Sequence, residues 1–201
     1  MNDLTRSTKV RSPKVSLDTR KDSGSFVDRL RQQFNASGHP AGSLSSASCI
    51  LLDTSGSMWE FIGANSRKID SLRLLAGNFK DVRRFEFGST CRELAPKDEI
   101  GDPKGGTSMH VAFLTLKAKG ITHCVMITDG LPDSMSQALS AAQGLKIDVF
   151  YVGPDPAPPW LALLARETGG QYGAASLDAR PALESRVRGL LPAPTKEPIK
   201  L

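Results

Sequence analysis

The sequence has 201 residues, of which 39% are hydrophobic and 23% charged, a composition typical of a globular α/β domain with additional segments. Its excess of basic residues lies at the ends, because residues 1–40 carry eight basic and four acidic side chains whereas residues 41–191 carry sixteen of each. A central domain without net charge argues against a DNA-binding stripe on its surface. Since there is also no membrane-spanning apolar run and no secretory signal after Met1, we expect a cytoplasmic protein.

The chain begins with a basic arm over residues 1–44. This arm is rich in Ser, Thr, Lys, Arg and Asp and poor in large apolar residues, so we expect it to be mostly disordered. Within it, apolar residues recur at helical spacing from Phe26 to Phe34, which predicts a short amphipathic helix near 26–34. Such a helix needs a surface to pack on, either on its own domain or on a partner.

Strand-like apolar runs alternate with helical segments from residue 45 to residue 191. The predicted strands are 48–52, 82–87, 123–128, 147–152 and a segment near 171–175, with a short edge strand at 91–95. The predicted helices are 67–80, 107–119, 134–144, 159–168 and 181–191. This alternation predicts an α/β fold with a mostly parallel sheet covered on both faces. Residues 192–201 form a Pro-rich tail.

The chain contains three cysteines, Cys49, Cys91 and Cys124. Cys49 and Cys124 fall within apolar strand-like runs, where a cysteine is usually a small buried side chain. An odd number of cysteines in a protein expected to be cytoplasmic favours reduced thiols over a disulfide or a metal site.

Three polar segments stand at the ends of predicted strands or helices. They are Asp53-Thr54-Ser55-Gly56-Ser57, Gly105-Gly106-Thr107-Ser108 and Ile127-Thr128-Asp129-Gly130. Each segment alone is also ordinary turn or helix-start chemistry. In the first, the side chains at i, i+2 and i+4 point to one side of an extended backbone. Together the three segments offer hard oxygen ligands, which suit Mg²⁺, Mn²⁺ or Ca²⁺ rather than Zn²⁺.

These segments resemble the metal-ion-dependent adhesion site of the von Willebrand factor A (VWA) domain family. The family pattern is Asp-x-Ser-x-Ser, then Thr, then Asp, and it is matched by Asp53, Ser55, Ser57, Thr107 and Asp129. The order of strands and helices is similar over residues 45–191. The resemblance implies a Rossmann-like, doubly wound, six-stranded sheet with the ion at its carboxyl edge. It also implies that the two serines and the threonine ligate the ion, while the two aspartates act largely through water.

The resemblance further implies a protein-binding module rather than an enzyme. A bound Mg²⁺, with Mn²⁺ and Ca²⁺ as alternatives, would take an acidic side chain from a partner, and intracellular members often serve as adaptors in AAA+ ATPase assemblies. Trp59 and Phe61 either form an apolar rim that contacts the partner or pack against their own loop, and His110 is a further candidate for that rim. Asp133 is either a second contributor to the site or, by preference, the cap of the following helix.

Other function classes fit the residues less well. A haloacid-dehalogenase-like phosphatase needs a carboxylate where Ser55 stands, and two glycines separate Lys104 from Thr107 in the segment that might bind phosphate. The sequence contains no Gly-x-Ser-x-Gly elbow. The remaining alternative is a nucleic-acid-associated protein that uses its basic N-terminal arm, but aromatic and basic residues are not interleaved there.

Overall fold

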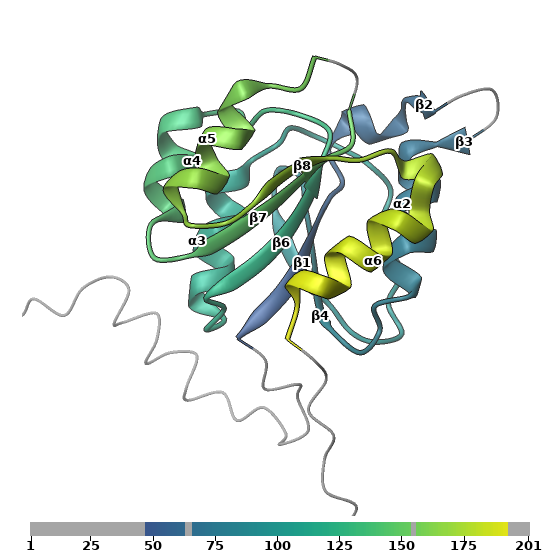
Figure 1. The fold of residues 1–201 in the computed structure, drawn as a ribbon, viewed down its shortest axis with the longest axis horizontal. Coiled ribbons are helices and arrows are strands. Elements are labelled where there is room, and N and C mark those ends of the chain that lie inside the picture. The colour runs from purple at the N-terminus through teal and green to yellow at the C-terminus, as the bar shows by residue number, and fades with distance from the viewer. Residues whose placement is uncertain (1–46, 63–65, 154–155, 193–201) are drawn as a thin grey trace, which may run out of the picture. The chain divides into compact units, whose positions relative to one another are not determined.

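The computed structural model describes residues 47–62, 66–153 and 156–192. The arm predicted over residues 1–44, its helix near 26–34, and all of the predicted tail beyond Pro192 lie outside these residues. Figure 1 shows a twisted sheet with helices on both of its faces. Each helix in this part of the chain is too short or too polar to cross a membrane.

The sheet has six strands in the order β5-β4-β1-β6-β7-β8. All neighbouring strands run parallel except β4 and β5, which are antiparallel and place β5 at one edge. The prediction of a mostly parallel six-stranded sheet with one antiparallel edge strand is therefore confirmed. The strands are β1 (Ser48–Asp53), β4 (Arg83–Phe87), β5 (Cys91–Leu94), β6 (His123–Thr128), β7 (Lys146–Tyr151) and β8 (Tyr172–Ala174).

Helices cover the two faces of the sheet because its central strands are apolar on both sides. In β1, Cys49 and Leu51 face one hydrophobic core, whereas Ile50 and Leu52 face the other. The first core is completed by α3 (Met109–Ala118), α4 (Met135–Ala142) and α5 (Pro159–Glu167), and the second by α2 (Lys68–Gly77) and α6 (Arg180–Leu190). The sheet is thus doubly wound, as predicted.

The carboxyl ends of β1 and β6 lie at the point where the strand order reverses. From β1 the chain runs through α2 to β4 and β5 on one side, and then returns through α3 to β6 on the other side of β1. The two crossovers leave in opposite directions, and ligands of open α/β sheets bind outside the carboxyl ends of the strands at such a switch point. Asp53 ends β1 and Asp129 directly follows β6, so both carboxylates stand at this switch point.

Three features of the chain differ from the sequence-based expectation. A small antiparallel hairpin, β2 (Phe61–Ile62) with β3 (Ser66–Arg67), follows a 3₁₀ turn at Gly56–Trp59. A second 3₁₀ turn, Leu177–Ala179, precedes α6. Strands of two residues carry no periodic pattern, so the hairpin was not predicted. In addition, the helix expected from residue 107 begins at Met109.

The cysteines are free thiols, and the two predicted to be buried are buried. Cys49 and Cys124 are directly opposite each other on β1 and β6. Burial raises the pKa of both thiols well above the ordinary value, so they are unreactive core residues.

Candidate metal centre

A chain of hydrogen bonds joins four of the five predicted metal ligands. The hydroxyls of Ser55 and Ser57 are 3.1 Å apart, and Ser57 Oγ donates to Asp129 Oδ1 at 2.8 Å. Asp53 accepts the backbone N–H of Ser55 at 2.8 Å. The loop after β1 therefore meets the end of β6 at the carboxyl edge of the sheet.

Asp53 is the buried anchor of this network. Its Oδ1 accepts from Ser55, and its Oδ2 accepts from the hydroxyl of Thr128 at 2.5 Å. Burial raises the pKa of Asp53 from 3.8 to about 6, although the hydrogen bonds from Thr128 and Ser55 oppose that rise. A nearby divalent cation would favour the ionised carboxylate and so remove this cost. Because each oxygen already accepts a protein hydrogen bond, Asp53 is suited to act through water.

The loop that carries Thr107 is attached to the loop after β1 by backbone hydrogen bonds. Gly56 N–H donates to Gly105 O at 3.1 Å, and Lys104 N–H donates to Thr54 O at 2.9 Å. The two backbones can approach each other because Gly56 and Gly105 have no side chains. Gly105 has φ +72°, and a Cβ there would collide with the Ser89 side chain. These contacts bring the segment that carries Thr107 against the loop after β1.

Asp133 fixes the start of α3 rather than capping its own helix. Its Oδ1 accepts the N–H of Thr107 at 2.9 Å, and its Oδ2 accepts the Ser108 hydroxyl at 2.7 Å. These two hydrogen bonds lower the pKa of Asp133. The N-cap of α4 is Ser134, which accepts from Gln137 N–H, so the preferred cap prediction for Asp133 was wrong. The carboxylate instead binds the two residues that precede α3, the backbone of Thr107 and the hydroxyl of the N-cap residue Ser108.

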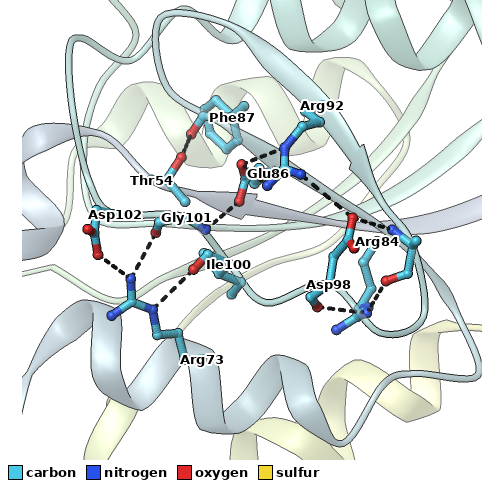
Figure 2. A network of polar contacts seen from close by, with 11 residues as sticks. Thr54, Arg73, Arg84, Glu86, Phe87, Arg92, Asp98, Ile100, Gly101 and Asp102 are labelled. Atoms are coloured by element: carbon cyan, nitrogen blue, oxygen red, sulfur yellow. Dashed lines mark hydrogen bonds and ion pairs between the residues drawn. The ribbon is translucent and has the colours of Figure 1, made fainter.

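A polar network holds the segment between β5 and α3, which leads to Thr107 (Figure 2). The buried Arg84 side chain donates to the carbonyl oxygens of Ala95 and Pro96 at 2.8 and 3.2 Å. Glu86 accepts the N–H of Gly101 at 2.8 Å, and Arg73 donates to Ile100 O at 3.2 Å. The segment between β5 and α3 is therefore held in place by side chains from β4 and α2.

Lys68 is the main site residue that the sequence analysis missed. Its ammonium group lies 2.7 Å from Asp129 Oδ2 and 2.5 Å from Glu60 Oε2. Desolvation lowers the pKa of Lys68, but its hydrogen bonds with Asp129 and Glu60 outweigh that effect and raise it. A sequence signal existed, because Lys68 is the first residue of α2. A cation is unfavourable at a helix N-terminus and calls for a compensating anion.

The donor set fits a small hard cation. The 3.1 Å between the Ser55 and Ser57 hydroxyls matches the edge of about 3.0 Å between neighbouring ligands in an octahedron with Mg–O distances near 2.1 Å. In the described part of the chain no three His, Cys, Asp or Glu side chains gather as a metal-binding group. A metal at this edge would therefore depend on hydroxyl ligands together with Asp53 and Asp129.

The three predicted rim residues have different surroundings. The Trp59 side chain is fixed by contacts within the protein, since its Nε1 donates to Pro103 O at 2.8 Å and the Arg67 guanidinium lies over its ring. Phe61 is 62% exposed on β2. His110 is half-buried on α3, where it lines a groove towards α4 with Leu114. Among the described residues, its buried Nδ1 has no hydrogen-bond partner. Their role as a rim stays a prediction.

A hydrogen-bonded Ser–His–Asp chain lies near the amino-terminal ends of the strands, opposite the candidate metal site. Ser48 Oγ is 3.3 Å from His123 Nδ1, and His123 Nε2 is 2.6 Å from Asp148 Oδ2. Ser48 is only 8% exposed, and Asp148 Oδ1 also accepts the N–H of Gln171 at 2.6 Å. We interpret this chain as a structural link between the amino-terminal ends of β1, β6 and β7, because its serine is buried within the sheet.

Comparison with known proteins shows the fold. No protein-family model matches the sequence, and no curated protein matches it. Among solved structures, a von Willebrand factor type A protein from Catenulispora acidiphila matches with a TM-score of 0.56 at 16% identity, over 71% of this chain and 41% of that one. Proximal thread matrix protein 1 from the mussel byssus matches with a TM-score of 0.54 at 13% identity, over 72% and 45%.

The mussel protein was also solved with a zinc-occupied metal-ion-dependent adhesion site, and that structure matches with a TM-score of 0.51 at 14% identity, over 70% of this chain and 44% of that one. The chain thus spans less than half the length of each of these three structures. At such low identity the likeness establishes the architecture and leaves the activity to be argued from the site.

Proposed function

We propose that this chain, which has the VWA fold, is a protein-binding module that holds a divalent cation and captures an acidic side chain of a partner. Ser55, Ser57 and Thr107 would hold the cation directly, and Asp53 and Asp129 would hold it largely through water. When bound, the cation supplies positive charge at the open edge of the site, where it attracts a carboxylate.

The observation that carries this proposal is the hydrogen-bonded row Ser55–Ser57–Asp129 at the carboxyl edge of the sheet. The Ser57 hydroxyl donates its proton to Asp129 and accepts from Ser55, so one lone pair of its oxygen remains for a cation. The inner ligands are neutral hydroxyls, so a bound dication would keep most of its charge. A carboxylate from another protein would then be the natural remaining ligand.

We further propose Mg²⁺ as the resting metal, because magnesium prefers the octahedral oxygen geometry that the two serines suit. The occupied site of the mussel protein supports a divalent cation at such a site, although that ion is zinc. The three free cysteines suit a reducing compartment such as the cytoplasm. The setting that the family resemblance implies is an adaptor role in an AAA+ ATPase assembly.

The experiment that tests this function is a pull-down from host lysate with the full chain, in Mg²⁺ or in EDTA. Wild type is compared with Ser57→Ala, which removes one hydroxyl ligand, and with Ser185→Ala, which removes an exposed hydroxyl on α6. We expect wild type and Ser185→Ala to retain the same partner in Mg²⁺ and to release it in EDTA. Ser57→Ala should not retain it.

The same assay distinguishes metal-bridged protein binding from nucleic-acid binding through the basic N-terminal arm. Metal-bridged capture is lost in EDTA and changes little with salt, whereas binding through a basic arm falls steeply as salt rises and ignores EDTA. A partner retained equally by Ser57→Ala, or in EDTA, would contradict the metal-bridged function. Replacement of the partner's contacting Asp or Glu by Asn or Gln then completes the test.

A further inference from the structure

The buried ion pair between Lys68 and Asp129 is the feature of the site that the VWA pattern does not contain. Lys68 Nζ contacts Asp129 Oδ2, while Asp129 Oδ1 accepts from Ser57. One carboxylate thus has an ammonium on one oxygen and the proposed metal ligand on the other. The Lys68 side chain is 8% exposed and that of Asp129 is fully buried, so solvent screens this pair weakly.

We propose that Lys68 is a built-in cation of the site, which competes with the metal for Asp129 and thereby weakens metal binding. The inference rests on the proposed function and adds a residue that sets its affinity. Two like-charged groups that share one carboxylate repel each other, and the repulsion is strong where water is excluded. Lys68 therefore makes the metal-free site stable and the metal easier to release.

Lys68 stands at a position that is unfavourable for a cation, which indicates that its pairing with Asp129 has a role in the site. Arg67 and Lys68 put two cations at the start of α2, where the helix dipole disfavours positive charge. Burial of an ammonium adds a desolvation cost. A residue whose only role was to form the helix would carry neither the repulsion from the helix dipole nor the cost of desolvating an ammonium. At this position the ammonium instead neutralises Asp129, which would otherwise be a buried carboxylate when no metal is bound.

Glu60 is a second partner of Lys68, and it remains available when a metal draws on Asp129. Glu60 lies 2.5 Å from Lys68 Nζ, and its side chain is 63% exposed. Glu60 and Lys68 line one pocket of about 530 Å³ together with Phe61 and Leu177. With metal bound, Asp129 would be shared between two cations, and Glu60 would remain as the counter-ion of Lys68.

Metal titration of the Lys68 variants tests this proposal without any partner. Metal-stripped full-length protein is titrated with Mn²⁺ in a calorimeter as wild type, Lys68→Met, Lys68→Gln and Lys68→Arg. We expect the two neutral variants to bind Mn²⁺ more tightly than wild type, on the order of tenfold. Lys68→Arg keeps the charge and should bind like wild type. Lys80→Met removes an exposed lysine after α2 and serves as the control, with an unchanged Kd.

Thermal melts of the same variants give a second readout. In EDTA the neutral variants should melt below wild type, because Asp129 then lacks a counter-ion, and saturating Mn²⁺ should close that gap. Lys68→Gln keeps a hydrogen-bond donor for Asp129 and remains informative if Lys68→Met does not fold. Equal or weaker Mn²⁺ binding by the folded neutral variants would overturn the role of Lys68 while leaving the proposed function standing. The absence of Mn²⁺ binding by wild type and by both neutral variants would overturn both.

Discussion

The Ser57 hydroxyl donates a hydrogen bond of 2.8 Å to Asp129 Oδ1, although the two residues are 72 positions apart in the chain. This bond joins the loop after β1 to the end of β6 and sets the direction of the Ser57 lone pairs. The site is therefore organised by protein contacts before any ligand arrives. A preorganised set of oxygens loses less entropy when it binds a cation.

The buried carboxylate of Asp53 makes stability depend on pH in the metal-free protein. Its pKa is raised from 3.8 to about 6 in the folded state, so between these values the folded protein binds a proton that the unfolded chain has released. Stability then falls as pH rises from about 4 to about 6, by a total of about 3 kcal/mol. Urea unfolding in EDTA at several pH values measures this fall.

Asp53→Asn removes the charge and should flatten that pH dependence. We expect the variant to be more stable than wild type in EDTA at pH 7.5, by up to about 3 kcal/mol. With Mg²⁺ at the same pH, wild type should gain stability and Asp53→Asn should gain little. A variant that is less stable than wild type in EDTA at pH 7.5 would contradict the cost assigned to the buried carboxylate.

Gly105 should tolerate substitution less well than Gly120, because of its surroundings as well as its backbone. Gly105 and Gly120 have nearly the same φ, +72° and +73°, but only a Cβ at Gly105 would collide with a neighbour. Gly120→Ala should cost about 1 kcal/mol, the usual penalty for a left-handed alanine. Gly105→Ala should cost about 3 kcal/mol, since overpacking adds to that penalty. Chemical unfolding of both variants gives the two values.

The two glycine variants should also differ in metal binding. Gly105 O accepts from Gly56 N–H, so displacement of this loop moves Thr107 relative to the serines. We expect Mn²⁺ affinity to fall about tenfold or more in Gly105→Ala and to stay unchanged in Gly120→Ala. Equal affinities in the two variants would show that the Thr107 loop does not shape the site.

Arg84 should contribute far more to stability than its neighbour Arg92. Arg84 is buried and donates to the carbonyls of Ala95 and Pro96, whereas Arg92 is half-exposed and pairs with Glu86. Arg84→Met leaves these carbonyls without a donor, so we expect a loss of about 2–4 kcal/mol. Arg92→Ala should cost less than about 1 kcal/mol. Similar values for both would contradict the larger contribution of Arg84 to the network in Figure 2.

The sheet was predictable because its central strands are short apolar runs that end in aspartate or threonine. The runs over 48–52 and 123–128 coincide with β1 and β6 to within one residue, since strands buried on both faces have few polar interruptions. The hairpin at 61–67 was not predictable, because its two-residue strands depend on contacts made only in the fold. Arg67 over the rings of Trp59 and Phe61 is one such contact.

The candidate site was predictable only where its residues follow one another at a fixed spacing or end a strand. Asp53, Ser55 and Ser57 share one loop, and Asp129 stands at the equivalent edge of β6. Lys68 joins Asp129 across 61 positions, and Asp133 reaches back to Thr107 across 26. The position of Lys68 at the start of a helix indicates that it needs an anion, but the packing of α2 and the loop before α4 determine which residues pair, and local patterns do not encode that choice.

The measurement that tests the central claim most directly is an electron paramagnetic resonance titration of the metal-stripped chain with Mn²⁺. The free Mn²⁺ signal disappears as the ion binds, so the titration gives both stoichiometry and affinity. We predict one ion per chain for wild type and for Ser185→Ala, and binding weakened by about tenfold or more in Ser57→Ala. Undiminished Mn²⁺ binding by Ser57→Ala, or no saturable binding by wild type, would contradict a metal centre built on these hydroxyls.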